Sequence, residues 1–109
     1  MPVVDVRVSE INDWESFHDT FAATLGFPEF YGRNMDAWID CLTHCDGPDA
    51  GMTAVHARDG DVLTLQLDAG RAFAKRCPEQ YKALIECAAF VNWRRVDIGE
   101  RPILTLSFR

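Results

Sequence analysis

The chain has 109 residues, of which 48% are hydrophobic and 11% aromatic, and its formal net charge at pH 7 is −6. This length predicts a single domain spanning residues 1–109, and the apolar content is sufficient to fold it without a metal or a set of disulfides. The composition excludes an intrinsically disordered protein and a nucleic-acid-binding protein that relies on a basic face.

The charge is unevenly distributed along the chain. Residues 1–50 contain ten acidic and two basic residues, a balance of −8, whereas residues 51–109 contain seven acidic and nine basic residues, a balance of +2. Such an asymmetry within one folded unit predicts an acidic face.

The N-terminal region predicts a strand followed by a helix. β-Branched residues alternate over residues 3–8, a pattern typical of a strand. Asn12 and Glu15 resemble the reciprocal capping pair of a helix start. From Trp14 onward, large apolar residues repeat at helical spacing, and Gly26 is expected to end this first helix.

A loop and a short second helix are predicted next. Residues 27–33 contain a proline and a glycine and are expected to form a loop. Asn34 is a favourable N-cap, and apolar residues then recur at helical spacing over about 35–44. Residues 46–51 are rich in turn-forming residues and are expected to break the chain there.

The middle of the chain predicts a strand over 61–67. Asp59 and Gly60 form a pair typical of a hairpin turn, which would join residues 52–57 to this strand. Only the second arm of that hairpin has a strong strand pattern.

The C-terminal region predicts helices followed by a last strand. One or two helical turns are expected over 69–76, and a longer helix from Pro78 to about Trp93. Residues 102–108 are expected to form the closing strand. The order of strands and helices, with connections long enough for crossovers, predicts an α/β fold with a small parallel sheet packed with helices.

The cysteines are expected to be buried thiols without disulfides. Cys41, Cys45, Cys77 and Cys87 form no Cys-x-x-Cys pair. A metal site at Cys41 and Cys45 with His44 is the weaker alternative, because these groups do not supply four converging ligands. This cysteine usage favours the reducing cytoplasm, and no apolar run approaches the roughly 18 residues of a membrane span.

Motifs for enzymatic chemistry are missing from the sequence. We find no nucleophile elbow, no glycine-rich phosphate loop and no dinucleotide-binding fingerprint. His18 lies beside the apolar stripe of the first helix and is expected at the surface or its boundary rather than as a catalytic base. We therefore predict no enzymatic activity, no metal and no cofactor.

The second helix carries two carboxylates on its outer side. Asp36 and Asp40 are four residues apart, and no Lys or Arg at positions 37, 43 or 44 offsets their repulsion, so both carboxylates are expected to be unpaired. An ordinary solvated face is one interpretation. The adjoining aromatic residues Phe30 and Tyr31, expected to be exposed, favour a binding patch for a cationic partner instead. Catalysis by the pair is disfavoured, because two solvated carboxylates both stay ionised and leave no general acid.

The segment from Leu25 to Leu42 resembles the signature of the barstar family of intracellular ribonuclease inhibitors. It contains the run Pro-Glu-aromatic-Tyr-Gly-x-Asn-x-Asp-Ala-x-x-Asp-Cys-Leu, and the order of the flanking elements is similar over nearly the whole chain. The resemblance implies a three-stranded parallel sheet with about four helices. It also implies that the loop and second helix block the active-site cleft of a basic ribonuclease.

The same resemblance implies which residues contact the ribonuclease. Asp40 matches the acid that occupies the catalytic phosphate site, Asp36 a supporting acid, and Phe30 a tyrosine that stacks in the cleft. Ile39 stands where the family has a tryptophan, and residues 90–95 offer no match for an acid late in the family's last helix. The complete implied set is Phe30, Tyr31, Gly32, Asn34, Asp36, Ile39 and Asp40.

Three functions are therefore compared. The leading hypothesis is a cytoplasmic, non-enzymatic inhibitor of a basic ribonuclease; the alternative is a module of the same fold that binds another cationic protein. A small hydrolase using Asp36 and Asp40 is the weakest, because it would require a pocket around them. If the strand at 61–67 is central in the sheet, both its edges are occupied. Residues 52–57 should then be irregular or form a strand only outside the main sheet.

Overall fold

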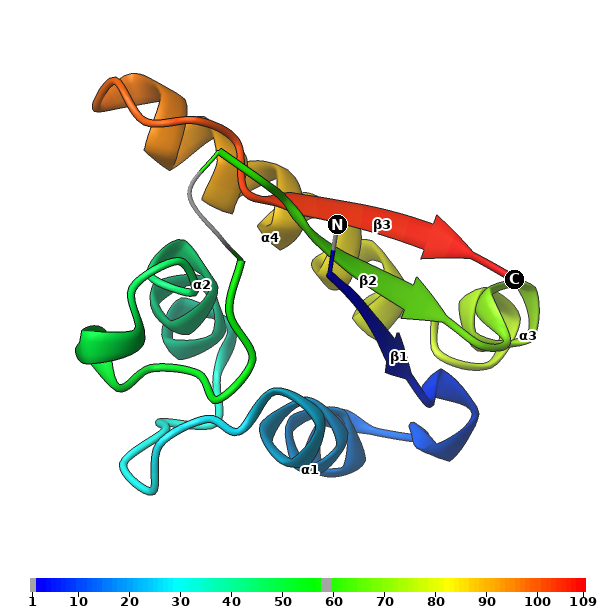
Figure 1. Ribbon diagram of the computed structural model, residues 1–109. Helices are drawn as coiled ribbons and strands as arrows, with labels where there is room; N and C mark the ends of the chain where they lie inside the picture. The colour runs from blue at the N-terminus through cyan, green and yellow to red at the C-terminus, as the bar shows by residue number, and fades with distance from the viewer. Residues whose placement is uncertain (1, 58–59) are drawn as a thin grey trace.

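The protein folds into a three-stranded parallel sheet packed with four α-helices, as predicted (Figure 1). The computed structural model describes residues 2–57 and 60–109. The strand order is β1-β2-β3, and both neighbouring pairs are parallel. In chain order, the elements are β1 (Val3–Val6), the 3-10 helix η1 (Val8–Glu10), α1 (Trp14–Leu25), α2 (Met35–Thr43), the 3-10 helix η2 (Pro48–Ala50), β2 (Leu63–Leu67), α3 (Gly70–Arg76), α4 (Pro78–Asp97) and β3 (Leu104–Phe108).

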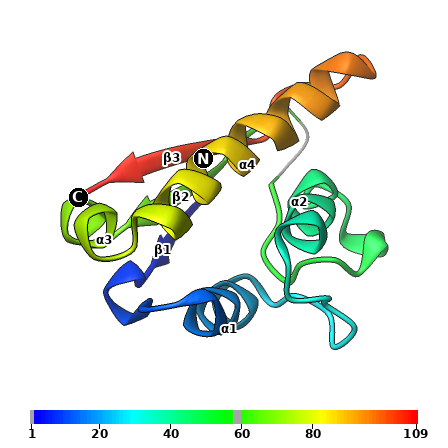
Figure 2. The same cartoon turned by 180° about the vertical axis from the view of Figure 1, so that it is seen from behind.

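Strand β2 is the central strand and supplies much of the core. Leu63, Leu65 and Leu67 are completely buried. Leu65 pairs with Val4 of β1 on one side and with Leu106 of β3 on the other. Helices α1 and α2 connect β1 to β2, and α3 and α4 connect β2 to β3, as parallel neighbours require. Figure 2 shows α4 crossing one face of the sheet, with its C-terminal end extending beyond the strands.

Residues 52–57 form no strand, which confirms the expectation that followed from a central β2. The segment instead bonds to the ends of two helices. The Ala54 amide donates to the Leu25 carbonyl over 2.8 Å, and the Ala57 amide donates to the Cys45 carbonyl over 3.1 Å. Gly60 begins the second described stretch, whereas Asp59 of the predicted turn lies outside the described residues.

Two predicted boundaries in the N-terminal region were wrong. The first strand ends at Val6 rather than at residue 8, because η1 follows. The N-cap of α1 is Asp13, not Asn12: its carboxylate accepts from the Ser16 amide over 2.8 Å, and its own amide donates to Ser16 Oγ over 3.0 Å. Asn and Asp side chains can both cap a helix, but Ser16 lies three residues after Asp13, which is the spacing that the reciprocal capping pair requires.

Helix α4 continues four residues beyond the predicted end, to Asp97. Arg95 is only 8% exposed and explains the extension. Its guanidinium donates to the Thr43 carbonyl over 2.9 Å and to the Arg101 carbonyl over 2.8 Å, and it pairs with Asp46 at 3.0 Å. Contacts between distant segments, rather than local helical periodicity, therefore set this end of the helix.

Candidate partner-binding site

Helix α2 is oriented by a cap and by its buried side. The Asn34 side chain accepts a hydrogen bond from the Ala37 amide over 2.8 Å, which confirms the predicted N-cap. Trp38 is completely buried, and its indole meets the Phe21 ring edge-to-face with centroids 5.7 Å apart. The outer side of the helix is consequently fixed by the packing of its inner side.

Asp36 and Asp40 are both exposed on that outer side, as predicted. Asp36 lies in the first turn, where the helix dipole favours a negative charge. Asp40, however, has a cationic partner: Arg94 Nη1 of α4 donates to Asp40 Oδ1 over 2.9 Å. The interpretation of Asp40 as unpaired was wrong, because its partner comes from a different helix 54 positions along the chain. Both side chains remain well exposed, 54% for Asp40 and 40% for Arg94.

The loop before α2 separates its two aromatic residues. Phe30 is 76% exposed, as expected for a residue that contacts a partner. Tyr31 is only 9% exposed, so the expectation that both rings are exposed was wrong. Its hydroxyl lies 2.6 Å from His18 Nδ1, and its ring packs against Phe27 with centroids 4.6 Å apart. Tyr31 therefore fixes the loop from inside.

His18 is also buried, at 5% exposure, which corrects its expected place at the surface. Burial lowers the pKa of His18, and the positive charge of Arg33 lowers it further. Burial also raises the pKa of the Tyr31 hydroxyl. Both groups are therefore neutral near pH 7, and their hydrogen bond joins α1 to the loop without a buried charge.

Ile39 faces inward and is 8% exposed. The chain thus has a buried aliphatic residue where the resemblance implies a partner-contacting tryptophan. Gly32 and Asn34 are exposed, and the Asn34 side-chain amide donates to the Gly32 carbonyl over 3.3 Å. Among the residues proposed from the resemblance, Phe30, Gly32, Asn34, Asp36 and Asp40 reach the surface, whereas Tyr31 and Ile39 lie beneath it.

Arg33 is a part of this region that the motif search did not single out. Its backbone φ is +55°, an uncommon conformation for a residue with a side chain. Its guanidinium pairs with Asp19 at 2.8 Å and donates to the Glu15 carbonyl over 3.1 Å, so it ties the loop to α1. The sequence offered one indication that Arg33 matters, because it is one of only two basic residues among residues 1–50.

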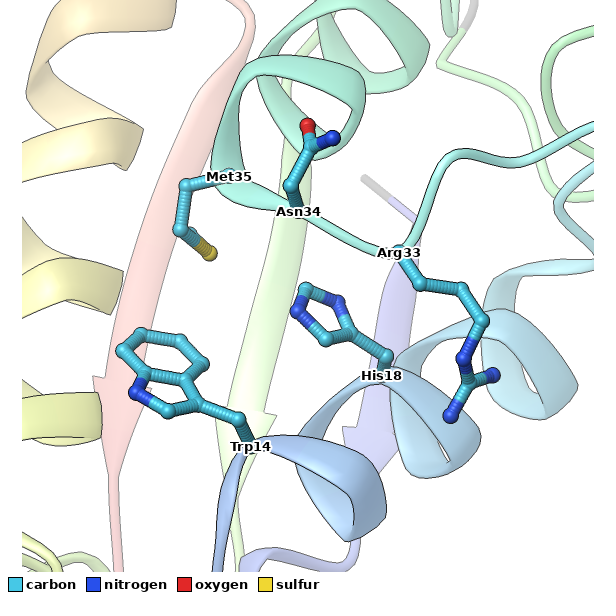
Figure 3. Close-up of a pocket in the computed structure, with 5 residues that line it drawn as sticks. All are labelled: Trp14, His18, Arg33, Asn34 and Met35. Carbon is cyan, nitrogen blue, oxygen red and sulfur yellow. The ribbon is translucent and has the colours of Figure 1, made fainter.

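A cavity of about 290 Å³ lies between α1 and the start of α2 (Figure 3). Trp14, His18, Arg33, Asn34 and Met35 line it. A second cavity, of about 320 Å³, lies near the C-terminal end of α4 and is lined in part by Asp46 and Arg95. Neither cavity is lined by Asp36 or Asp40.

The exposed carboxylates are suited to accept hydrogen bonds from Arg or Lys of a partner. Catalysis would instead need one of them desolvated and protonated. The exposure of this pair is therefore suited to binding a cationic partner.

The cysteines do not form a metal site in the described residues. Cys41, Cys45 and Cys77 are buried, as predicted, while Cys87 is half-buried. Burial raises the pKa of the Cys41 and Cys45 thiols to about 11, so both are protonated at neutral pH and are poor metal ligands. Across residues 2–57 and 60–109, no group of three or more His, Cys, Asp or Glu side chains is placed to hold a metal ion. No helix within these ranges is long and apolar enough to cross a membrane.

Comparison with known proteins shows the family of the chain. The chain is 44% identical over 41 residues to YrdF of Bacillus subtilis (strain 168), whose name marks it as a candidate ribonuclease inhibitor. The aligned segment covers 38% of this chain and 43% of that relative, so it spans less than half of the relative's length. Residues 1–103 match the family described as barstar, the barnase inhibitor. The chain belongs to the barstar family.

Proposed function

We propose that the protein inhibits a basic ribonuclease by inserting the outer side of α2 and its preceding loop into the active-site cleft of that enzyme. The observation that carries the proposal is the exposure of Asp36 and Asp40 on the rigid α2 of a barstar-family chain. A cleft that binds RNA phosphates presents Arg, Lys or His side chains, and a carboxylate held on a helix can occupy the place of a phosphate.

In this proposal the seven residues divide into three groups. Asp40, Asp36 and Phe30 contact the enzyme, while Gly32 and Asn34 shape the loop at its edge. Tyr31 and Ile39 hold the loop and helix from beneath, since each is at least nine-tenths buried. The protein would act inside the cell that makes the ribonuclease, as an immunity protein without catalytic activity of its own.

The test is inhibition of RNA cleavage by barnase, with another small basic protein, hen lysozyme, as a binding control. We expect Asp40→Ala to weaken binding by roughly 2–5 kcal/mol, the range typical of truncating one member of a buried charge pair, to which complexes of this family have themselves contributed. Glu10→Ala is the matched control, because it also removes an exposed carboxylate but lies in η1, outside α2 and the loop before it.

The acidic face also predicts that association with barnase slows as salt is added, because screening weakens electrostatic steering. Unchanged binding of Asp40→Ala would refute the assignment of the site. Equal binding of barnase and lysozyme, without inhibition of cleavage, would favour the alternative of a general module for cationic proteins.

A further inference from the structure

Helix α4 carries an aromatic pair that the proposed site does not include. Phe90 is 45% exposed and Trp93 is 58% exposed, and their ring centroids lie 5.5 Å apart. Large aromatic side chains that contact each other at the surface form a compact apolar patch, and such patches are typical of interaction sites.

The aromatic pair adjoins the acidic side of α2. Arg94 of α4 pairs with Asp40 of α2 at 2.9 Å, and the half-buried Cys87 lies about two turns before Arg94 on the same helix. Phe90 is three residues after Cys87 and four before Arg94, so the three side chains follow one ridge of the helix. Phe90 therefore lies on the same side of α4 as Arg94, the partner of Asp40, and Trp93 extends the patch through its contact with Phe90.

We infer that Phe90 and Trp93 of α4 contact an apolar rim of the same ribonuclease beside its basic cleft. This inference rests on the proposed function. Its support is continuity: the aromatic pair lies on the helix that packs against α2 and that supplies the partner of Asp40. Apolar anchors next to charged contacts are the arrangement that concentrates binding energy at protein interfaces.

The test compares α4 variants in binding to barnase by calorimetry. Phe90→Ala, Trp93→Ala and the double variant remove the patch, and Ile85→Ala is the matched control. Ile85 is 37% exposed on the same helix, but lies about 140° round it from Phe90. We expect the double variant to weaken binding about tenfold or more, as for interface aromatic residues, and the control to stay within about twofold of wild type.

Salt dependence separates an apolar contact from an indirect effect on the neighbouring ion pair. The loss caused by the double variant should be the same at low and high salt, whereas the loss caused by Asp40→Ala should shrink as salt screens its charge. Circular dichroism and thermal unfolding of each variant check that the fold is retained.

The outcomes distinguish the inference from the proposed function. If wild type binds and Asp40→Ala weakens binding, but the double variant binds like Ile85→Ala, the inference is overturned and the proposed function stands. If the loss in the double variant disappears at high salt, the aromatic pair acts only through Arg94, and the inference is again overturned. If wild type does not bind barnase, both fail.

Discussion

Replacing Arg94 by alanine should strengthen binding to the ribonuclease. Arg94 Nη1 contacts Asp40 over 2.9 Å, so a cation of the enzyme must compete with it for the same carboxylate. The arginine and aspartate side chains are 40% and 54% exposed, and an ion pair that exposed is worth only about 0.2–1 kcal/mol. Removing the competitor should therefore tighten binding by up to about fivefold.

Titration calorimetry of wild type, Arg94→Ala and Arg94→Lys against barnase measures this gain. Arg94→Lys keeps the positive charge and should bind more nearly like wild type. The free energy of unfolding, from urea denaturation, should fall by less than about 1 kcal/mol in Arg94→Ala, because the lost ion pair is solvated. Weaker binding of Arg94→Ala would refute the competition and would mean that Arg94 itself contacts the enzyme.

The remaining predictions concern stability. Because the pKa of His18 is lowered in the folded protein, unfolding favours its protonation below about pH 6.5, and the free energy of unfolding should fall as the pH drops. Urea denaturation at several pH values from 8 to 5 measures this fall, and His18→Gln should show a weaker dependence of the free energy of unfolding on pH. Arg95→Ala should lose roughly 3–5 kcal/mol in the same assay, since the arginine is a buried partner of Asp46; a loss below 1 kcal/mol contradicts this. Gly26→Ala should lower the melting temperature more than Gly51→Ala. Both positions have positive φ, but only a Cβ at position 26 would clash with Ala54, so an equal fall in melting temperature would contradict the clash.

The order of elements and the exposed face of α2 could be predicted because local patterns determine them. Asn34 is a strong cap, and the apolar residues that follow it leave Asp36 and Asp40 on the other side whatever the surrounding fold. The parallel sheet follows from the order of strands and helices, since adjacent parallel strands require long crossovers.

Several features of the site could not be predicted because they depend on contacts between distant residues. The partner of Asp40 lies on α4, and helical spacing within α2 carries no information about it. The burial of Tyr31 depends on His18, which lies in the preceding helix. The hydrogen bond between their side chains satisfies both polar groups, so both can be buried. A loop composition rich in aromatic residues is equally compatible with exposed and with buried rings.

The buried part of the site bears directly on affinity. Tyr31 is held by His18 and Phe27, and Trp38 packs against Phe21, so the carboxylates are presented from a backbone that is already ordered. Binding then costs little conformational entropy, because the loop and helix are already ordered. Asp36 and Asp40 in turn are exposed, so a partner can cover them directly. The interior of α2 thus supplies rigidity and its surface supplies charge, which is the combination that the proposed inhibition needs.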